Sequence, residues 1–225
     1  MFATDSILVV RARFIHLFPK PELQSTPQIY TPIAQHSFGW TDGVSVAPPR
    51  LLNNAGSSSD FASLSILIQG EINDPWSSGQ RSLDLFTLHP NPSYRSSASD
   101  TNTGMSPVPY IFPPTLTAQV HTVRGSLRCR NFILGRCGTA VWIHPRDLMY
   151  ETTLCDCVVV AAFPGPLAAS SPFGDSDSPA SSSVIQGIKL HANYLYNSWT
   201  SLDYDEERGR VVLGSSYGPI MILEF

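Results

Sequence analysis

Four acidic side chains lie close together near the end of the chain, at Asp203, Asp205, Glu206 and Glu207. Two carboxylates that face one cleft can hydrolyse glycosides when their environments drive their pKa values apart. This acidic group, however, occupies a polar stretch between two apolar segments, where a turn that carries solvated charges is expected. The sequence therefore favours a non-catalytic protein, with a small all-β, glycosidase-like hydrolase as an alternative.

The four cysteines, Cys129, Cys137, Cys155 and Cys157, are the other residues whose type could support a site. A zinc site usually pairs two ligands two to four residues apart, twice over, and these cysteines lack that spacing. We expect buried, reduced thiols that behave as small hydrophobes, with a disulfide or a metal as the alternative. Because the six histidines are also scattered, we expect no catalytic residue, no cofactor and no metal ligand.

The composition narrows the class of protein. The 225 residues are 42% hydrophobic and 14% charged, and the formal net charge is −4. The 19 prolines and 15 glycines are spread along the chain, which disfavours long helices. No basic stripe indicates nucleic-acid binding, and no apolar run has the length of a signal core or a membrane span. We expect an intracellular protein, cytoplasmic or nuclear, that binds neither nucleic acid nor membranes.

The C-terminal stretch indicates the architecture most clearly. It predicts three short strands, at Trp199 to Tyr204, Arg210 to Ser215 and Pro219 to Phe225. Gly209 and Gly218 supply the two turns between them. Val211 to Leu213 and Pro219 to Leu223 are apolar without interruption, whereas a sheet with one wet face would alternate apolar and polar residues. The pattern predicts a sheet covered on both faces, as in the stacked blades of a β-propeller.

Two further patterns bear on the number of blades. A Leu-Gly step followed by a second glycine occurs at Leu134 and at Leu213, 79 residues apart, which is close to two blade lengths of about 40–45 residues. Asp42-Gly43 lies between His36 to Trp40 and Val44 to Val46 and predicts another hairpin. In all we expect about ten to twelve short strands at four strands per blade. The expected fold is all-β, a partial β-propeller of about three blades built from antiparallel hairpins.

Residues 1–225 are expected to form a single β-rich domain with long Ser/Pro-rich loops. Flexible loops are predicted at about residues 53–60, 90–109 and 167–183. Seventeen residues, from Leu167 to Ser183, contain seven serines and only two large apolar side chains, Leu167 and Phe173. Burial of two such side chains does not offset the conformational entropy lost on ordering the segment.

Tryptophan and arginine side chains in turns are the candidates for binding a partner protein. Trp76 lies in a turn-rich segment and is the best candidate for an exposed aromatic anchor, although packing beneath its own loop is the alternative. Arg81 and Arg136 are secondary candidates. Trp142 and Trp199 lie inside apolar strands and are expected to pack between blades.

Six segments distributed over nearly the full length resemble the C-terminal region of the F-box-like proteins of mushroom-forming fungi. They are Phe38 to Val46, Asn73 to Trp76, Arg124 to Cys129, Leu134-Gly135 with Gly138 to Ile143, Phe163 to Pro166, and Leu202 to Ser215. The last segment is the most specific. The resemblance implies a β-rich, propeller-like region that recognises the substrates of a ubiquitin ligase.

In that family an N-terminal F-box, a short helical module, docks on the Skp1-type adaptor of a cullin ubiquitin ligase. This chain has no amphipathic segment with Leu-Pro before Ser6, so no residue here is assigned to adaptor binding. The adaptor is expected as a partner only if a missing F-box precedes the chain, and the partner protein itself is unknown. A further alternative is a truncated remnant without independent function.

Overall fold

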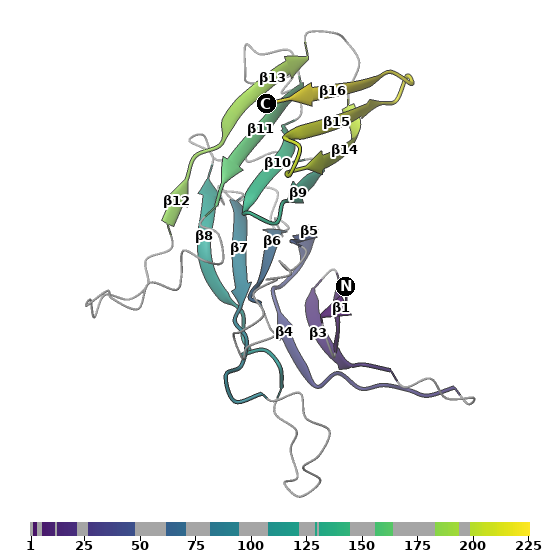
Figure 1. Ribbon diagram of the computed structural model, residues 1–225, viewed down its shortest axis with the longest axis vertical. Helices are drawn as coiled ribbons and strands as arrows, with labels where there is room; N and C mark the ends of the chain where they lie inside the picture. Colours follow the sequence, from purple (N-terminus) through teal and green to yellow (C-terminus); the bar gives the residue numbers. More distant parts are fainter. Residues whose placement is uncertain are drawn as a thin grey trace, which may run out of the picture.

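The computed structural model of the chain describes residues 2–3, 6–11, 13–21, 27–47, 62–70, 82–94, 108–121, 129, 131–144, 156–163, 183–193 and 199–225. Within these residues β-strands are the only long regular elements, which confirms the all-β class. Sixteen strands form four sheets that follow one another in chain order (Figure 1).

Each sheet is built mainly from strands that are consecutive in the chain. The first contains β1 (Phe2–Ala3), β2 (Ser6–Val10), β3 (Phe14–Pro19) and β4 (Ala34–Ser37). The second contains β5 (Thr41–Val46), β6 (Leu64–Gly70), β7 (Ser82–Leu88) and β8 (Thr115–His121), with β12 (Ser183–Ile185) at its edge. The third contains β9 (Phe132–Leu134), β10 (Thr139–His144), β11 (Asp156–Ala162) and β13 (Ile188–Asn193), and the fourth contains β14 (Trp199–Asp205), β15 (Arg210–Ser215) and β16 (Ile220–Glu224).

All neighbouring strands are antiparallel except β12, which pairs parallel to β8. Only two residues, Gln186 and Gly187, separate β12 from β13. One continuous segment therefore adds an edge strand to the second sheet and then an edge strand to the third.

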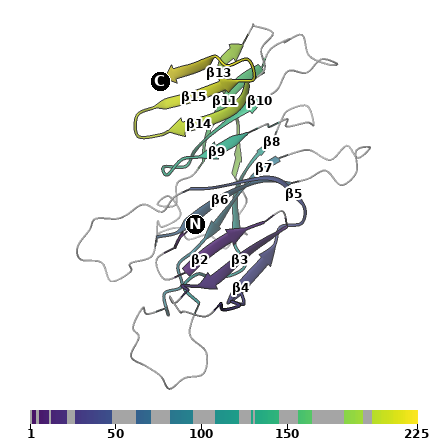
Figure 2. The same cartoon turned by 90° about the vertical axis from the view of Figure 1, so that its right-hand side faces the viewer.

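The four sheets stack face to face, and three hydrophobic cores lie between them (Figure 2). The first and second sheets enclose a core that includes Leu8, Ile15, Leu17, Leu64, Ile66 and Ile68. The second and third enclose one that includes Leu67, Leu83, Leu85, Leu134, Trp142 and Val159. The third and fourth enclose one that includes Val141, Ile143, Val158, Trp199, Val211 and Leu213. As predicted, Trp142 and Trp199 are buried between sheets, at 2% and 3% exposure.

The position of a sheet in this stack decides whether one or both of its faces are covered. In the second and third sheets, β6 and β10 are buried along nearly their whole length, because each sheet has a neighbour on either face. In the fourth sheet, β16 alternates between exposed and half-buried residues. The expectation that the C-terminal strands are covered on both faces is therefore wrong, since the described residues cover only the face toward the third sheet.

The first strands of three successive sheets lie side by side, β5 against β9 and β9 against β14. The Ser45 hydroxyl accepts a hydrogen bond from the Leu134 amide at 2.9 Å, which joins β5 to β9. A Cβ atom on Gly43 would lie 2.5 Å from the ring of Phe132. Gly43 therefore permits close packing within a strand, and the predicted Asp42-Gly43 turn is wrong.

The turn near Asp42-Gly43 lies earlier, where Gly39 has a φ of 79°. The strands on either side of it belong to different sheets, because β4 pairs with β3 and β5 pairs with β6. The turns predicted at Gly209 and Gly218 are confirmed, with φ values of 60° and 97°.

The described residues form four sheets, and the predicted partial propeller of about three blades is not confirmed. Several strands were missed because they are short or polar, such as β4 and β13, and carry no continuous apolar run. The Leu-Gly repeat matches a hairpin but not a position in the sheet, because its copies form the β9–β10 and β15–β16 hairpins. The two turns have the same hydrogen bonds, and the Gly138 φ of 96° matches that of Gly218.

The three predicted flexible loops fall largely outside the described residues, namely all of 53–60 and most of 90–109 and 167–183. The two ends of the second loop are joined by a bridge between Pro90 and Tyr110. The Asn91 side chain also donates a hydrogen bond to the Val108 carbonyl at 2.8 Å. Ser183, the last residue of the third predicted loop, begins β12.

Candidate functional site

Of the three predicted partner-binding residues, Trp76 and Arg81 lie outside the described residues. Arg136 lies in the turn between β9 and β10, and its side chain is half exposed. Its guanidinium contacts the Glu207 carboxylate at 3.4 Å. Because Glu207 is itself largely exposed, this is a surface ion pair between the third and fourth sheets.

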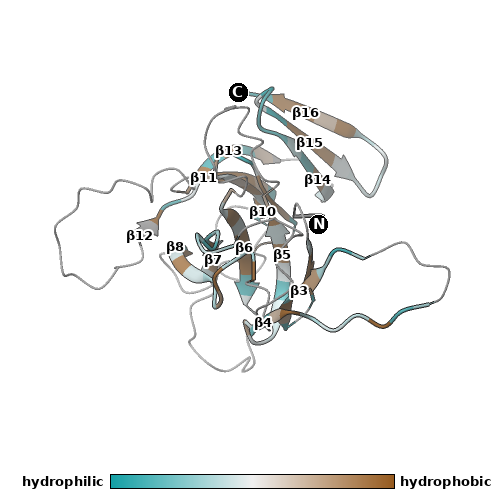
Figure 3. Ribbon diagram, turned by 60° about the horizontal axis from the view of Figure 1, so that its bottom comes forward, coloured by the Kyte–Doolittle hydropathy of each residue, from teal (hydrophilic) through white to brown (hydrophobic). Residues whose placement is uncertain are grey.

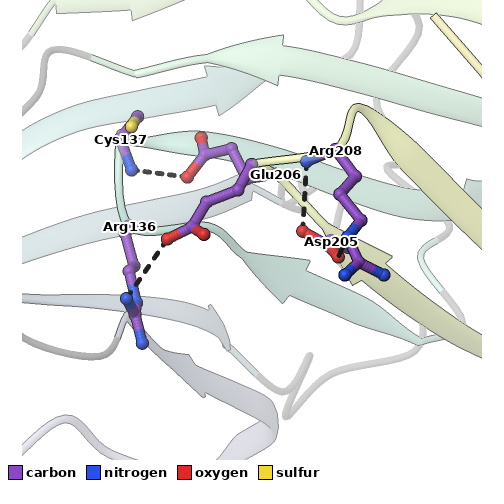
Figure 4. Close-up of polar contacts among 6 residues, drawn as sticks. Arg136, Cys137, Asp205, Glu206 and Arg208 are labelled. Carbon is purple, nitrogen blue, oxygen red and sulfur yellow. Dashed lines mark hydrogen bonds and ion pairs between the residues drawn. The ribbon is translucent and has the colours of Figure 1, made fainter.

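The neighbouring Glu206 makes two polar contacts between these two sheets. Its carboxylate accepts a hydrogen bond from the backbone amide of Cys137 at 2.6 Å (Figure 4). It also accepts one from the backbone amide of Thr139 at 3.1 Å. Hydrogen bonds to an ionised acceptor are stronger than those between neutral groups. The β14–β15 turn therefore holds the β9–β10 turn through one side chain, and we name this contact the turn latch.

The backbone of the β9–β10 turn leaves room for the turn latch. A Cβ atom on Gly135 would lie 2.5 Å from the Glu206 carboxylate, so a side chain there would displace that carboxylate. Close by, burial raises the pKa of the Tyr204 phenol, and the negative charge of Glu206 raises it further. Two other polar contacts join the same sheets, because the Asn131 amide donates to the Thr200 carbonyl and the Asp156 carboxylate accepts from the Trp199 amide.

Each acid that suggested hydrolase chemistry has a partner in or next to this turn. Asp205 accepts from the Arg208 amide at 3.2 Å and pairs with its guanidinium at 3.6 Å (Figure 4). Asp203 accepts from the Tyr204 amide at 2.9 Å. Glu206 does not point freely into solvent, as a solvated cluster would require, because it binds the opposite turn. Glu206 and Glu207 therefore join two sheets, whereas Asp203 and Asp205 make local contacts within the fourth.

The segment Gly214 to Gly218 has the Gly-x-Ser-x-Gly spacing of a nucleophile elbow, with Ser216 at the nucleophile position. The sequence-based prediction that no such motif is present was wrong about this spacing. That motif needs a sharp turn from a strand into a helix. Here the segment ends β15 and forms the hairpin turn to β16, and no described residue forms a hydrogen bond with the exposed Ser216 hydroxyl. Its geometry is that of a β-turn.

The cysteines are only partly as expected. Cys157 is buried, Cys129 is half-buried, and no disulfide bond joins the described cysteines. Burial raises the pKa of the Cys129 thiol far above its usual range. Cys137 departs from the expectation because it is exposed at the turn latch. Cys155 lies outside the described residues.

An exposed Arg–Trp pair that the sequence analysis did not identify lies at the other end of the stack. The Arg13 guanidinium lies 4.6 Å from the ring centre of Trp40, whose side chain is 48% exposed. The Arg13 carbonyl accepts a hydrogen bond from the Phe38 amide at 2.9 Å, which fixes the two turns against each other. Trp40 follows Gly39, so a tryptophan directly after a turn glycine was the available signal.

Arg13 and Trp40 are residue types that dominate protein–protein interfaces. The stacked cation–π geometry holds the flexible arginine over a rigid ring, so less side-chain freedom remains to be lost on binding. We name this feature the Arg13–Trp40 pair.

The described residues also bear on two other possibilities, a metal site and a membrane-spanning helix. Nowhere among them do three or more His, Cys, Asp or Glu side chains gather in a way that could hold a metal ion. The same part of the chain has no helix of the length and apolarity needed to cross a membrane.

Comparison of the chain with models of protein families, with curated proteins and with solved structures finds no match.

Proposed function

We propose that this protein is a non-catalytic protein-interaction module with the architecture of a partial β-propeller. Two features support the architecture, namely face-to-face stacking of consecutive sheets and the convergence of their first strands. In a propeller, four-stranded blades are arranged around an axis with the first strands nearest to it. Four stacked sheets correspond to four blades of such an assembly.

The observation that carries the binding function is the Arg13–Trp40 pair. A half-exposed tryptophan under an ordered arginine offers a partner a large apolar surface and a fixed positive charge. Arg136 is a weaker candidate, because its charge is already compensated by Glu207. Trp76 and Arg81 stay candidates from the sequence alone.

The resemblance to the F-box-like proteins suggests the class of function, recognition of proteins for a ubiquitin ligase. On that hypothesis the present residues would bind the target protein. An F-box elsewhere would bind the Skp1-type adaptor, and residues 1–225 alone would not.

The test is affinity capture from an extract of a mushroom-forming fungus with three proteins, namely the wild type, Trp40→Ala and Tyr217→Ala. Tyr217 is also highly exposed but lies in the β15–β16 turn, at the opposite end of the stack. We expect a defined set of proteins to be retained by the wild type and by Tyr217→Ala and lost with Trp40→Ala. Equal retention by all three variants would contradict the assignment of the Arg13–Trp40 pair.

Two alternatives are separated by simple measurements. The hydrolase hypothesis needs two carboxylates that can exchange protons with a substrate, and it predicts turnover of glycosides that is lost when Glu206 is replaced by Gln. The remnant hypothesis predicts a chain that does not unfold cooperatively. A single cooperative unfolding transition would contradict it.

A further inference from the structure

Each end of the stack presents a sheet face with exposed apolar side chains that no described segment covers. On the fourth sheet the outer face carries Val212, Ile220 and Ile222, and the last two are 72% and 60% exposed. Figure 3 shows β16 as mostly hydrophobic. The same face also carries charged residues that flank these three, namely Asp203, Asp205, Arg210 and Glu224. Their neighbours Met221 and Leu223 point the other way, into the core with the third sheet. We name Val212, Ile220 and Ile222 the C-terminal outer face.

The outer face of the first sheet carries the side chains that alternate with its buried ones. These are Ile7, Val9, Phe14, His16 and Phe18. The three rings on β3 form a ladder, with centres 5.7 Å apart from Phe14 to His16 and 5.9 Å apart from His16 to Phe18. Phe14 is 36% exposed. We name this set the N-terminal outer face.

The two end sheets carry charges of opposite sign. Residues 199–225 contain five acids and two arginines, a net charge of −3. Residues 1–37 contain Arg11, Arg13 and Lys20 and two acids, Asp5 and Glu22, a net charge of +1. Like ends would repel each other, whereas unlike ends attract. The charges favour contact of the N-terminal outer face with the C-terminal outer face.

We infer that two copies of this chain close a ring, each burying its C-terminal outer face against the N-terminal outer face of the other. The three internal cores provide the template, since each joins two sheet faces of this stack through apolar side chains. Figure 1 shows the two end sheets on the same side of the arc formed by the inner sheets. A two-fold axis then creates both contacts at once. Four sheets from each copy give eight, which lies within the usual range of about four to eight blades.

The inferred dimer goes beyond the proposed binding function and can be refuted independently of it. The test measures the mass of the purified full chain by sedimentation equilibrium and native mass spectrometry. We expect a dimer of twice 24.6 kDa that does not grow with concentration. A monomer at every soluble concentration would overturn the inference. A series of ever larger species would overturn it as well, because open chains of copies do not close a ring.

Substitutions distinguish the proposed contact from other dimers. Ile222→Lys places a positive charge opposite the positive end, and Phe14→Glu places a negative charge opposite the negative end. Each is expected to weaken the dimer at least about 100-fold, because an unpaired buried charge is costly. Ile188→Lys is the matched control, since Ile188 on β13 is 66% exposed and lies on neither outer face. It should leave the dimer intact.

A mixture of the two disrupted variants gives the sharpest result. A heterodimer of Ile222→Lys and Phe14→Glu has one interface with Lys facing Glu and one of wild-type composition. We expect heterodimers in the mixture and monomers of each variant alone. Contact between two like ends would leave one variant dimeric on its own, which would overturn the inference. If circular dichroism shows that either variant is unfolded, Ile220→Lys and Val9→Glu replace them on the same faces.

Discussion

The inner sheets and the end sheets use similar sequences in different surroundings. The β6 sequence Leu-Ser-Ile-Leu-Ile-Gln-Gly and the β16 sequence Ile-Met-Ile-Leu-Glu both contain consecutive apolar residues. β6 is buried on both faces because sheets lie on either side of it, whereas β16 is buried only toward the third sheet. Apolar residues on both faces of a strand therefore indicate surfaces suited to burial, and the neighbouring sheets determine which of them are buried.

The largest expected effect concerns the inner pair of sheets. Replacing Trp142 by Ala is expected to lower the free energy of unfolding by about 3–5 kcal/mol, because the ring fills the core between the second and third sheets. Urea denaturation measures this change. Ile188→Ala, on the edge strand β13 of the same sheet, should change it by less than about 0.5 kcal/mol because Ile188 is 66% exposed.

Trp199→Ala sharpens the comparison, because this tryptophan is buried equally well but at the end of the stack. Hydrogen exchange should show lost protection in the fourth sheet alone, since the inner sheets keep their shared core. Trp142→Ala should lower protection in both inner sheets. The same pattern for both variants would show that the stack unfolds as one unit, contrary to this distinction.

The connection between the inner sheets predicts the next largest effect. A Cβ atom on Gly187 would lie 2.7 Å from a side-chain carbon of Val159 and 2.8 Å from the ring of Trp142. Gly187→Ala is therefore expected to cost about 1–3 kcal/mol through overpacking, although the residue is exposed. Thermal unfolding measures the loss. Gly70→Ala is the control, because a Cβ there meets no atom within 4 Å.

The turn latch tests the polar attachment of the end sheet. Glu206→Ala removes the acceptor for two backbone amides and is expected to cost about 1–3 kcal/mol, as for hydrogen bonds to a charged group. Urea denaturation provides the measurement. Glu207→Ala removes only an exposed ion pair and should cost less than about 1 kcal/mol. Equal losses would indicate that general charge matters more than the two amide contacts.

The smallest expected effect is a difference in the chemical reactivity of two cysteines. At pH 8, iodoacetamide should modify the exposed Cys137 rapidly and the free thiol of Cys129 slowly. Burial raises the pKa of Cys129, so little of the reactive thiolate is present. Peptide mapping of the time course measures both rates. Unfolding in urea should make the two rates converge, whereas a lasting difference would point to local sequence effects.

The sequence predicted the strand class and the packing role of two tryptophans, because continuous apolar β-branched segments depend little on distant neighbours. Prediction from the sequence failed where the role of a residue depends on its contact with another sheet. Gly43 looked like a turn residue but is small to admit the ring of Phe132, and Glu206 looked solvated but binds a turn far away in the chain. The exposure of Trp40 likewise depends on how the turn after β2 meets the turn after β4. Such long-range relationships have no local pattern to reveal them.

The two-residue step from β12 to β13 has a mechanical consequence. We call the continuous segment from β12 to β13 the strap. Because the strap is hydrogen-bonded to β8 of the second sheet and to β11 of the third, these two middle sheets cannot separate while both strand pairings persist. The terminal layers have no strap of this kind among the described residues. Under a pulling force the outermost layers should peel away first, and the strapped middle should yield last and in a single event.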